Sequence, residues 1–136
     1  MAEQIRAGAH QAKAGDSRRR LGNAGERLAA ERLRQAGYII RMLNYRCPAG
    51  EIDIVAEEGG DIVFVEVKTR RGDAYGLPEE AVTPAKQRKL IAAAQTYLEA
   101  NGCAHASWRA DVVAVALTSA GKLQEVRLYR HAISAE

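Results

Sequence analysis

Residues 50–70 read Gly-Glu-Ile-Asp-Ile-Val-Ala-Glu-Glu-Gly-Gly-Asp-Ile-Val-Phe-Val-Glu-Val-Lys-Thr-Arg, and the predicted fold is built around this run. Two runs rich in β-branched residues flank Gly59-Gly60, a pair that accepts positive φ at both central positions of a type I′ turn. The pattern therefore predicts a β-hairpin in which Glu58 is paired with Asp61.

The two-residue turn also predicts which side chains face one another across the hairpin. Counting back from the turn sets Asp53 opposite Glu66 and Glu51 opposite Lys68, with all four on one face. The other face is predicted to be apolar, with Ile52, Ile54, Ala56, Val63, Val65 and Val67. The chemistry of the hairpin is therefore expected on its mixed face.

Paired carboxylates on that face suggest a metal site. Opposed side chains approach to about 5 Å at Cβ, where two ionised carboxylates repel by roughly 3 kcal/mol at an effective dielectric constant near 20. A divalent cation between the carboxylates would turn this repulsion into a net attraction. Mg²⁺ typically binds one or two carboxylates and keeps several water ligands, which leaves room for a substrate phosphate. Lys68 adds a cation beside Glu66. The alternative is a solvated outer face with a weak ion pair between Glu51 and Lys68.

Length and composition indicate one domain. A chain of 136 residues with 47% hydrophobic content can bury a substantial core. Residues 1–17 are polar and without periodicity, which predicts a flexible basic tail, and residues 18–136 are expected to form the single domain. Residues 1–46 carry ten Lys or Arg against four acids, a balance that suits a polyanion although solubility alone also explains it.

Cysteine usage and hydropathy suggest a cytoplasmic protein. Cys47 and Cys103 have no C-x-x-C spacing, and no apolar run approaches the ~20 residues that cross a bilayer. The start of the chain lacks a signal-peptide pattern. A membrane partner is therefore not expected.

Periodicity and turn signals predict the order α-β-β-β-α-β-β. The expected elements are a helix over 17–36, a strand over 38–45, the hairpin, a long connection over 70–82, a helix after Thr83-Pro84 ending near Gly102, and strands over 108–117 and 123–129. A right-handed crossover through the second helix makes the fourth strand parallel to the third. We expect an α/β fold whose mixed five-stranded sheet carries helices on both faces.

Two further acidic residues need an interpretation. Glu26 in the first helix has no basic residue three or four positions away, so it either serves a site elsewhere or is an ordinary exposed glutamate. Asp111 shares a strand face with Arg109, which favours a structural ion pair.

Glu26, Gly50-Glu51-Ile52-Asp53 and Phe64-Val65-Glu66-Val67-Lys68 together resemble the PD-(D/E)XK nuclease superfamily. More closely, the chain from about Leu21 onward resembles the small bacterial YraN-like proteins, through the Gly-x-x-Gly-Glu helix, the Asn44-Tyr45-Arg46 stretch and the hairpin motifs. Those proteins are similar to archaeal Holliday-junction resolvases. The resemblance implies a restriction endonuclease-like fold and a nuclease activity.

The resemblance also implies roles for single residues. Asp53 and Glu66 would hold Mg²⁺ or Mn²⁺ together with the main-chain carbonyl of Val67. Lys68 would position or activate the attacking water, and Glu26 would contribute through a water molecule on the metal. The sequence departs from the superfamily pattern at one position, because Ile52 stands where proline commonly precedes the aspartate.

DNA is the expected substrate, with branched or junction DNA suggested by the distant relatives. Junction cleavage requires two active sites, which suggests a homodimer. The residues expected to contact phosphates are Arg18, Arg19, Arg20, Arg70, Arg71, Lys86, Arg88 and Lys89. The alternative is a non-catalytic nucleic-acid-binding or adaptor module that keeps the nuclease fold.

Overall fold

The computed structural model describes residues 16–72 and 82–133, with side chains from Asn23 onward. Its elements are α1 (Asp16–Gln35), β1 (Ile39–Cys47), β2 (Gly50–Glu58), β3 (Asp61–Arg71), α2 (Pro84–Ala100), β4 (Trp108–Leu117) and β5 (Leu123–Ile133). The predicted order of helices and strands is confirmed.

The five strands form one mixed sheet in the order β1-β2-β3-β4-β5. β3 and β4 are parallel, and the other neighbouring strands are antiparallel. The parallel pair follows from α2, because a crossover helix carries the chain back to the end of the sheet at which β3 began. The α/β fold with a mixed five-stranded sheet is therefore confirmed.

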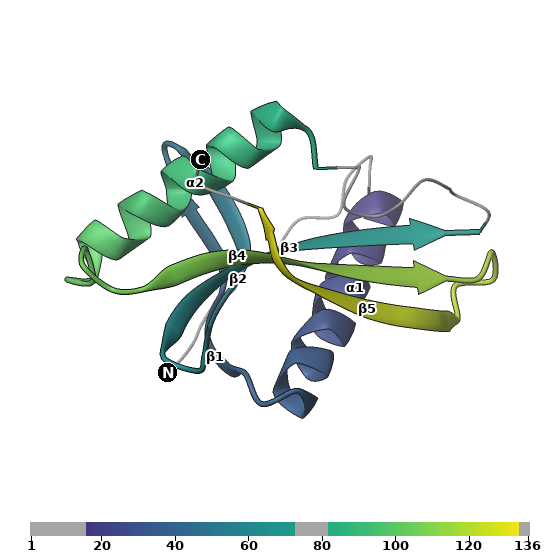
Figure 1. The fold of residues 1–136 in the computed structure, drawn as a ribbon. Coiled ribbons are helices and arrows are strands. Elements are labelled where there is room, and N and C mark those ends of the chain that lie inside the picture. The colour runs from purple at the N-terminus through teal and green to yellow at the C-terminus, as the bar shows by residue number, and fades with distance from the viewer. Residues whose placement is uncertain (1–15, 73–81, 134–136) are drawn as a thin grey trace.

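The two helices cover opposite faces of the sheet, as predicted (Figure 1). On one face, Leu90 and Tyr97 of α2 belong to a core that also holds Phe64. On the other face, Ala29 and Leu33 of α1 pack in a core with other strand residues, which are Ile54, Ala56, Val63, Val65, Val113, Val115 and Leu117. The alternation of side chains along the strands supplies both cores.

The hairpin turn forms as predicted, with φ of 60° at Gly59 and 90° at Gly60. Backbone pairing runs from Glu58 and Asp61 back to Ile54 and Val65, and it ends there.

The predicted pairings beyond that point are wrong. Asp53 and Glu66 are not backbone partners, and neither are Glu51 and Lys68. Glu51 instead lies 3.7 Å from Arg46, so the alternative ion pair between Glu51 and Lys68 does not form either. Beyond the last backbone pair, the Val67 amide donates to the Asp53 side chain instead of to a backbone carbonyl.

The faces of the hairpin also differ from the prediction. Ile52 packs in the α2 core, whereas Ile54 and Ala56 pack in the α1 core, so the predicted single apolar face breaks between Ile52 and Ile54. Val55 and Phe64 of the mixed face are fully buried in the α2 core. A simply solvated outer face is therefore excluded.

Element boundaries shift by a few residues. β3 continues to Arg71, so the first residues of the predicted connection over 70–82 are strand, and residues 73–81 lie outside the described part. β1 extends past Tyr45 to Cys47, and β5 extends past Tyr129 to Ile133. Of the predicted tail, Asp16 and Ser17 belong to α1, and residues 1–15 are not described.

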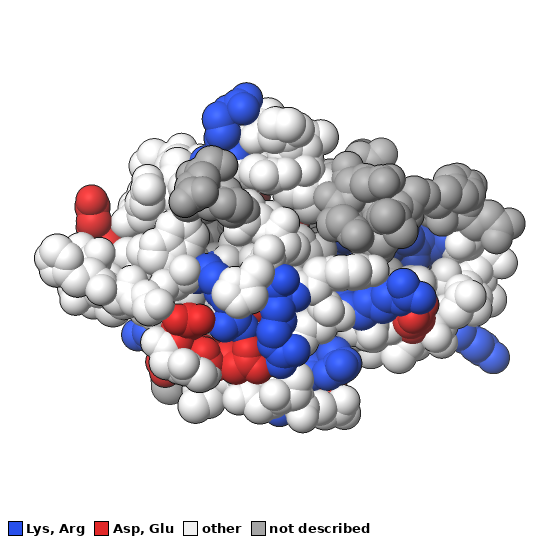
Figure 2. Space-filling view, in the orientation of Figure 1, with Lys and Arg blue, Asp and Glu red and all other residues white. Residues whose placement is uncertain are grey.

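Arg109 is the centre of an ion network at the turn end of the hairpin. Its guanidinium lies 3.0 Å from Asp111 and 2.9 Å from Asp61, and it also pairs with Glu58. Asp111 is fully buried and accepts a 2.7 Å hydrogen bond from the hydroxyl of Tyr38. The predicted pairing of Asp111 with Arg109 is confirmed. On the face shown in Figure 2, basic side chains lie around a group of acidic ones.

Candidate active site

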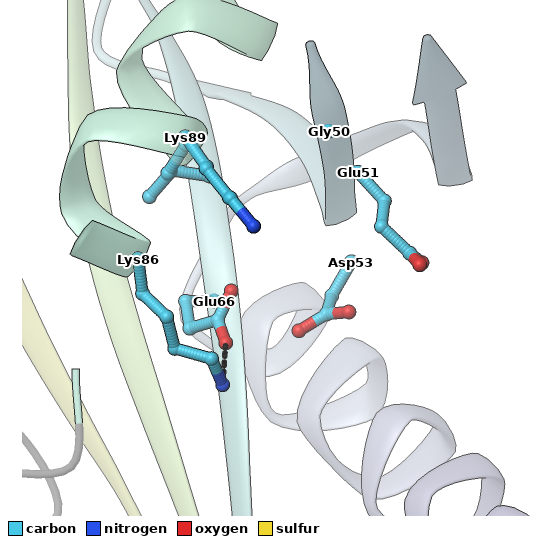
Figure 3. Close-up of a pocket in the computed structure, with 7 residues that line it drawn as sticks. Gly50, Glu51, Asp53, Glu66, Lys86 and Lys89 are labelled. Atoms are coloured by element: carbon cyan, nitrogen blue, oxygen red, sulfur yellow. Dashed lines mark ion pairs between the residues drawn. The ribbon is translucent and has the colours of Figure 1, made fainter. Parts of the chain in front are cut away.

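Asp53 and Glu66 come together where the hairpin strands separate. Oδ2 of Asp53 accepts a 2.8 Å hydrogen bond from the main-chain amide of Val67. This bond replaces strand pairing and holds the Asp53 carboxylate beside the strand that carries Glu66. Figure 3 shows both carboxylates directed toward the same space.

Lys68 lies next to this pair. Its Nζ is 3.7 Å from Oε2 of Glu66, and the side chains of Lys68 and Glu66 are only 18% and 17% exposed. An ion pair so enclosed is less screened than a surface pair. The three residues of the predicted Asp-Glu-x-Lys set therefore share one partly buried cluster.

A cavity of about 470 Å³ opens beside the cluster, between the hairpin and the start of α2 (Figure 3). Its lining residues are Gly50, Glu51, Asp53, Glu66, Lys86, Lys89 and Leu90. Nζ of Lys86 lies 4.0 Å from Oε2 of Glu66, the same oxygen that Lys68 approaches. The cavity thus has carboxylates on one wall and lysines on the other.

Helix α1 brings Glu26 to the same cluster. Burial raises the pKa of Glu26, whereas the neighbouring polar side chains of Asn44 and Asp53 lower it, so the three side chains lie close together. Of the two interpretations of Glu26, the structure favours the one in which it joins a distant site.

Gly25 explains how α1 comes so close to β3. A Cβ atom at Gly25 would lie 1.9 Å from Oγ1 of Thr69, which is far inside van der Waals contact. Glycine is therefore required for this helix to pack against the strand residue that follows Lys68.

The carboxylates of the cluster resist ionisation. Burial, followed by the charge of Glu66, raises the pKa of Asp53 well above its usual range, although the Val67 amide opposes this. Burial also raises the pKa of Glu66, against the lowering effect of the Lys68 and Lys86 charges. Burial and the nearby Lys86 lower the pKa of Lys68. The cluster is short of positive charge for its acids.

The donor set fits a small divalent cation. Within residues 16–72 and 82–133, no three His, Cys, Asp or Glu side chains are arranged to hold a metal ion. Mg²⁺, however, needs only one or two carboxylates and completes its coordination with water or phosphate oxygens. Asp53 and Glu66 supply two hard oxygen donors whose mutual repulsion a cation would relieve.

The predicted phosphate-binding residues separate into groups. Lys86 and Lys89 line the cavity, whereas Arg88 is exposed and is not part of its lining. Arg70 and Arg71 end β3, and Nε of Arg71 donates a 3.1 Å hydrogen bond to the carbonyl of Ser119. The helical residues Arg18, Arg19 and Arg20 lie in the first turns of α1, where side chains are not described.

Two residues of the site were not among the predicted functional residues. Glu51 lines the cavity, and its charge raises the pKa of Asp53 and of Glu66. The predicted position of Glu51 on the mixed face of the hairpin was the feature of the sequence that could have indicated this role. Asn44 adopts a positive φ of 56° and reaches Glu26, and no pattern in the sequence indicates that conformation.

None of the helices in the described part of the chain is both long and apolar enough to span a membrane.

Comparison with known proteins places this chain in a protein family. The profile of "Uncharacterised protein family UPF0102" matches residues 25–115. The chain is 42% identical to a UPF0102 protein of Caldicellulosiruptor saccharolyticus, over 85% of this chain and 98% of the relative. It is 50% identical to one of Symbiobacterium thermophilum, over 86% and 98% of the two chains. It is 46% identical to one of Moorella thermoacetica, over 85% and 97%. The matched residues include Glu26, Asp53, Glu66 and Lys68, and the chain therefore belongs to UPF0102, the YraN-like family.

Proposed function

We propose that this protein is a Mg²⁺- or Mn²⁺-dependent nuclease that hydrolyses phosphodiester bonds of DNA. The observation that supports this most directly is the enclosed cluster of Asp53, Glu66 and Lys68 beside a cavity with a lysine-bearing wall. Carboxylates that hold a hard cation, next to ammonium groups that attract phosphate, are the combination that phosphodiester hydrolysis uses.

Asp53 and Glu66 would hold the cation, with the main-chain carbonyl of Val67 as a further oxygen donor. When bound, the ion would supply polarisation of the phosphoryl group and a lowered pKa for the attacking water. Lys68 is fixed by Glu66 at 3.7 Å, so its Nζ can orient the water or neutralise charge that develops on the phosphate oxygens. Glu26, next to Asp53, would accept hydrogen bonds from water in the site.

The net reaction adds one water across a P–O ester bond. The hydroxyl group goes to phosphorus, the ester bond to the leaving oxygen breaks, and that oxygen ends with the remaining proton. Lys68 is the group of this chain best placed to transfer or hold a proton during the exchange, because burial and Lys86 lower its pKa.

The polymer would approach along the cavity wall that α2 provides. Lys86 and Lys89 are one helical turn apart and both line the cavity, so they can contact successive phosphates or two oxygens of one phosphate. Such contacts carry no base information, so binding would be salt-dependent and largely independent of sequence. Branched or junction DNA is the substrate class suggested by the resemblance, and a homodimer would supply two active sites.

The test is a cleavage assay on a labelled panel with Mn²⁺ or Mg²⁺. The panel contains a four-way junction, a flap, single-stranded and duplex DNA, and RNA. The wild type is compared with Glu66→Gln and with the matched control Glu31→Gln, an exposed glutamate of α1 that pairs with Arg34. We expect cleavage by the wild type and by Glu31→Gln, and none by Glu66→Gln.

The same panel tests the rival function. If no substrate is cleaved while binding to one of them is retained, the protein is a non-catalytic nucleic-acid-binding or adaptor module. Equal cleavage by Glu66→Gln and the wild type would show that the activity belongs to a contaminant or to another site.

A further inference from the structure

Lys86 occupies an unfavourable place for a cation. It lies in the first turn of α2, where its main-chain amide donates to the N-cap oxygen of Thr83 and no acidic residue is present. The positive end of a helix dipole disfavours an ammonium group there. The nearby carboxylate of Glu66, which comes from β3, supplies the compensating charge.

Two lysines converge on a single oxygen of Glu66. Nζ of Lys68 lies 3.7 Å from Oε2. Nζ of Lys86 lies 4.0 Å from the same atom (Figure 3). One carboxylate oxygen therefore faces two positive charges from different elements. At Glu66, these two ammonium groups supply positive charge that a divalent cation held by Asp53 and Glu66 would otherwise supply.

The side chains of the two lysines differ in how easily they can move away from Glu66. The side chain of Lys68 is 18% exposed, whereas that of Lys86 is 52% exposed and borders the cavity. A long, half-exposed lysine side chain can change rotamer at little cost, but an enclosed one cannot. When a cation arrives at Glu66, Lys86 is the group that repulsion can displace.

The cavity gives the displaced side chain a destination. Lys89 lines the same wall one turn further along α2, so the two ammonium groups together can take the phosphate groups of a bound polymer. Arg88 lies between them in sequence but is not part of the lining, as helical spacing requires.

We propose that Lys86 is an exchanging counterion, which neutralises Glu66 in the metal-free protein and moves to a substrate phosphate when the metal binds. This inference rests on the proposed function, because it assigns the cation to Asp53 and Glu66. It makes metal and substrate binding cooperative, since the metal releases the lysine that binds phosphate, and the phosphate removes a competitor of the metal.

The test measures binding without turnover. Mn²⁺ affinity of the full chain is measured by titration calorimetry for the wild type, Lys86→Gln and the control Arg88→Gln. We expect Lys86→Gln to bind Mn²⁺ about two- to fivefold more tightly than the wild type, and Arg88→Gln to match the wild type. Lys86→Arg, which keeps the charge, should also remain near the wild type.

A second measurement determines affinity for a labelled four-way junction in Ca²⁺ at several salt concentrations. Lys86→Gln should bind the junction more weakly, with a slope of log affinity against log salt that is smaller by about one. Tighter Mn²⁺ binding together with weaker junction binding is the result expected from an exchanging counterion.

The outcomes separate the inference from the proposed function. Mn²⁺ binding that Lys86→Gln leaves unchanged or weakens would overturn the counterion role while leaving the metal site intact. If neither the wild type nor any of the three variants binds Mn²⁺, the metal site itself is wrong. If Asp53→Asn binds Mn²⁺ as the wild type does, the ion sits elsewhere and both proposals fail.

Discussion

The main-chain amide of Val67 donates a 2.8 Å hydrogen bond to Oδ2 of Asp53, just beyond the last backbone pair of the β2–β3 hairpin. A side chain thus takes over from strand pairing at the point where the site begins. The bond orients the Asp53 carboxylate between two neighbours of Val67, namely Glu66 and Lys68. The separation of the strands is therefore what opens the space in which the proposed cation and phosphate would bind.

Replacing Lys68 with alanine should remove catalysis with little effect on folding or binding. Because Lys68 would position the water or assist proton transfer, we expect kcat to fall by about 10²–10⁴. Lys86 still lies 4.0 Å from the same oxygen of Glu66, so Tm and junction affinity should stay close to the wild type. Single-turnover cleavage and fluorescence anisotropy measure the two effects, with the exposed Lys122→Ala as control. A loss of binding equal to the loss of cleavage would instead identify Lys68 as a phosphate contact.

Asp53→Asn should stabilise the metal-free protein at neutral and alkaline pH. Because burial and the Glu66 charge raise the pKa of Asp53, the folded state binds more protons than the unfolded state between the ordinary and the raised pKa. Wild-type stability then falls as pH rises through that window. Asparagine keeps an acceptor for the Val67 amide but carries no charge.

Thermal unfolding with a chelator at pH 8 and at pH 4 tests this. The Tm of Asp53→Asn should exceed that of the wild type by about 3–5 °C at pH 8, and the difference should shrink toward pH 4. A variant that is less stable by the same amount at both pH values would show that the hydrogen bond, rather than the charge, dominates.

Gly25→Ala should be destabilising although alanine favours a helix. A Cβ atom 1.9 Å from Oγ1 of Thr69 would push α1 from β3, at a cost of about 1–3 kcal/mol in the free energy of unfolding. It would also move Glu26 away from Asp53. The double variant with Thr69→Ala should recover most of the loss, because the clashing oxygen is gone. Urea denaturation of the four proteins gives the coupling energy, and additive effects would exclude the contact.

Glu58→Gln should lower the free energy of unfolding near neutral pH and change it much less in acid. Hydrogen bonds from Arg130 and Arg109 lower the pKa of Glu58 to about 2 from an ordinary value of 4.5. A group whose pKa is lower in the folded state than in the unfolded state stabilises the fold at pH values above its ordinary pKa. This stabilisation is lost as the pH falls through the pKa of the folded state.

The expected loss is about 1–2 kcal/mol at pH 7, reduced because Glu58 is partly exposed to solvent. Denaturation by urea at pH 7 and at pH 2.5 measures it, and the difference between the two proteins should be much smaller at the lower pH, which lies just above the folded pKa. Glu57→Gln, with its longer 3.4 Å ion pair to Arg41, is the control and should change little. A loss of stability that does not depend on pH would show that Glu58 acts through packing and not through its charge.

Local patterns were sufficient for most of the fold. Gly59-Gly60 predicted the hairpin, because the two positive φ angles of its turn depend on those two residues alone. Thr83 and Pro84 predicted the start of α2 for the same reason, since an N-cap is an interaction within one turn. The order of helices and strands, with a right-handed crossover through the second helix, predicted a mixed sheet with helices on both faces.

The elements, their order and the pairing near the turn follow from sequence patterns, as do the acidic and basic residues that can perform the proposed chemistry. Three contacts of the site could be seen only in the folded molecule: pairing stops at Ile54, Glu26 lies close to Asp53, and Lys86 reaches Glu66. The difference lies in the range of the interactions. Turns and caps depend on neighbours in the chain, whereas these contacts join residues on different elements, whose approach depends on how closely α1 and α2 pack against the sheet.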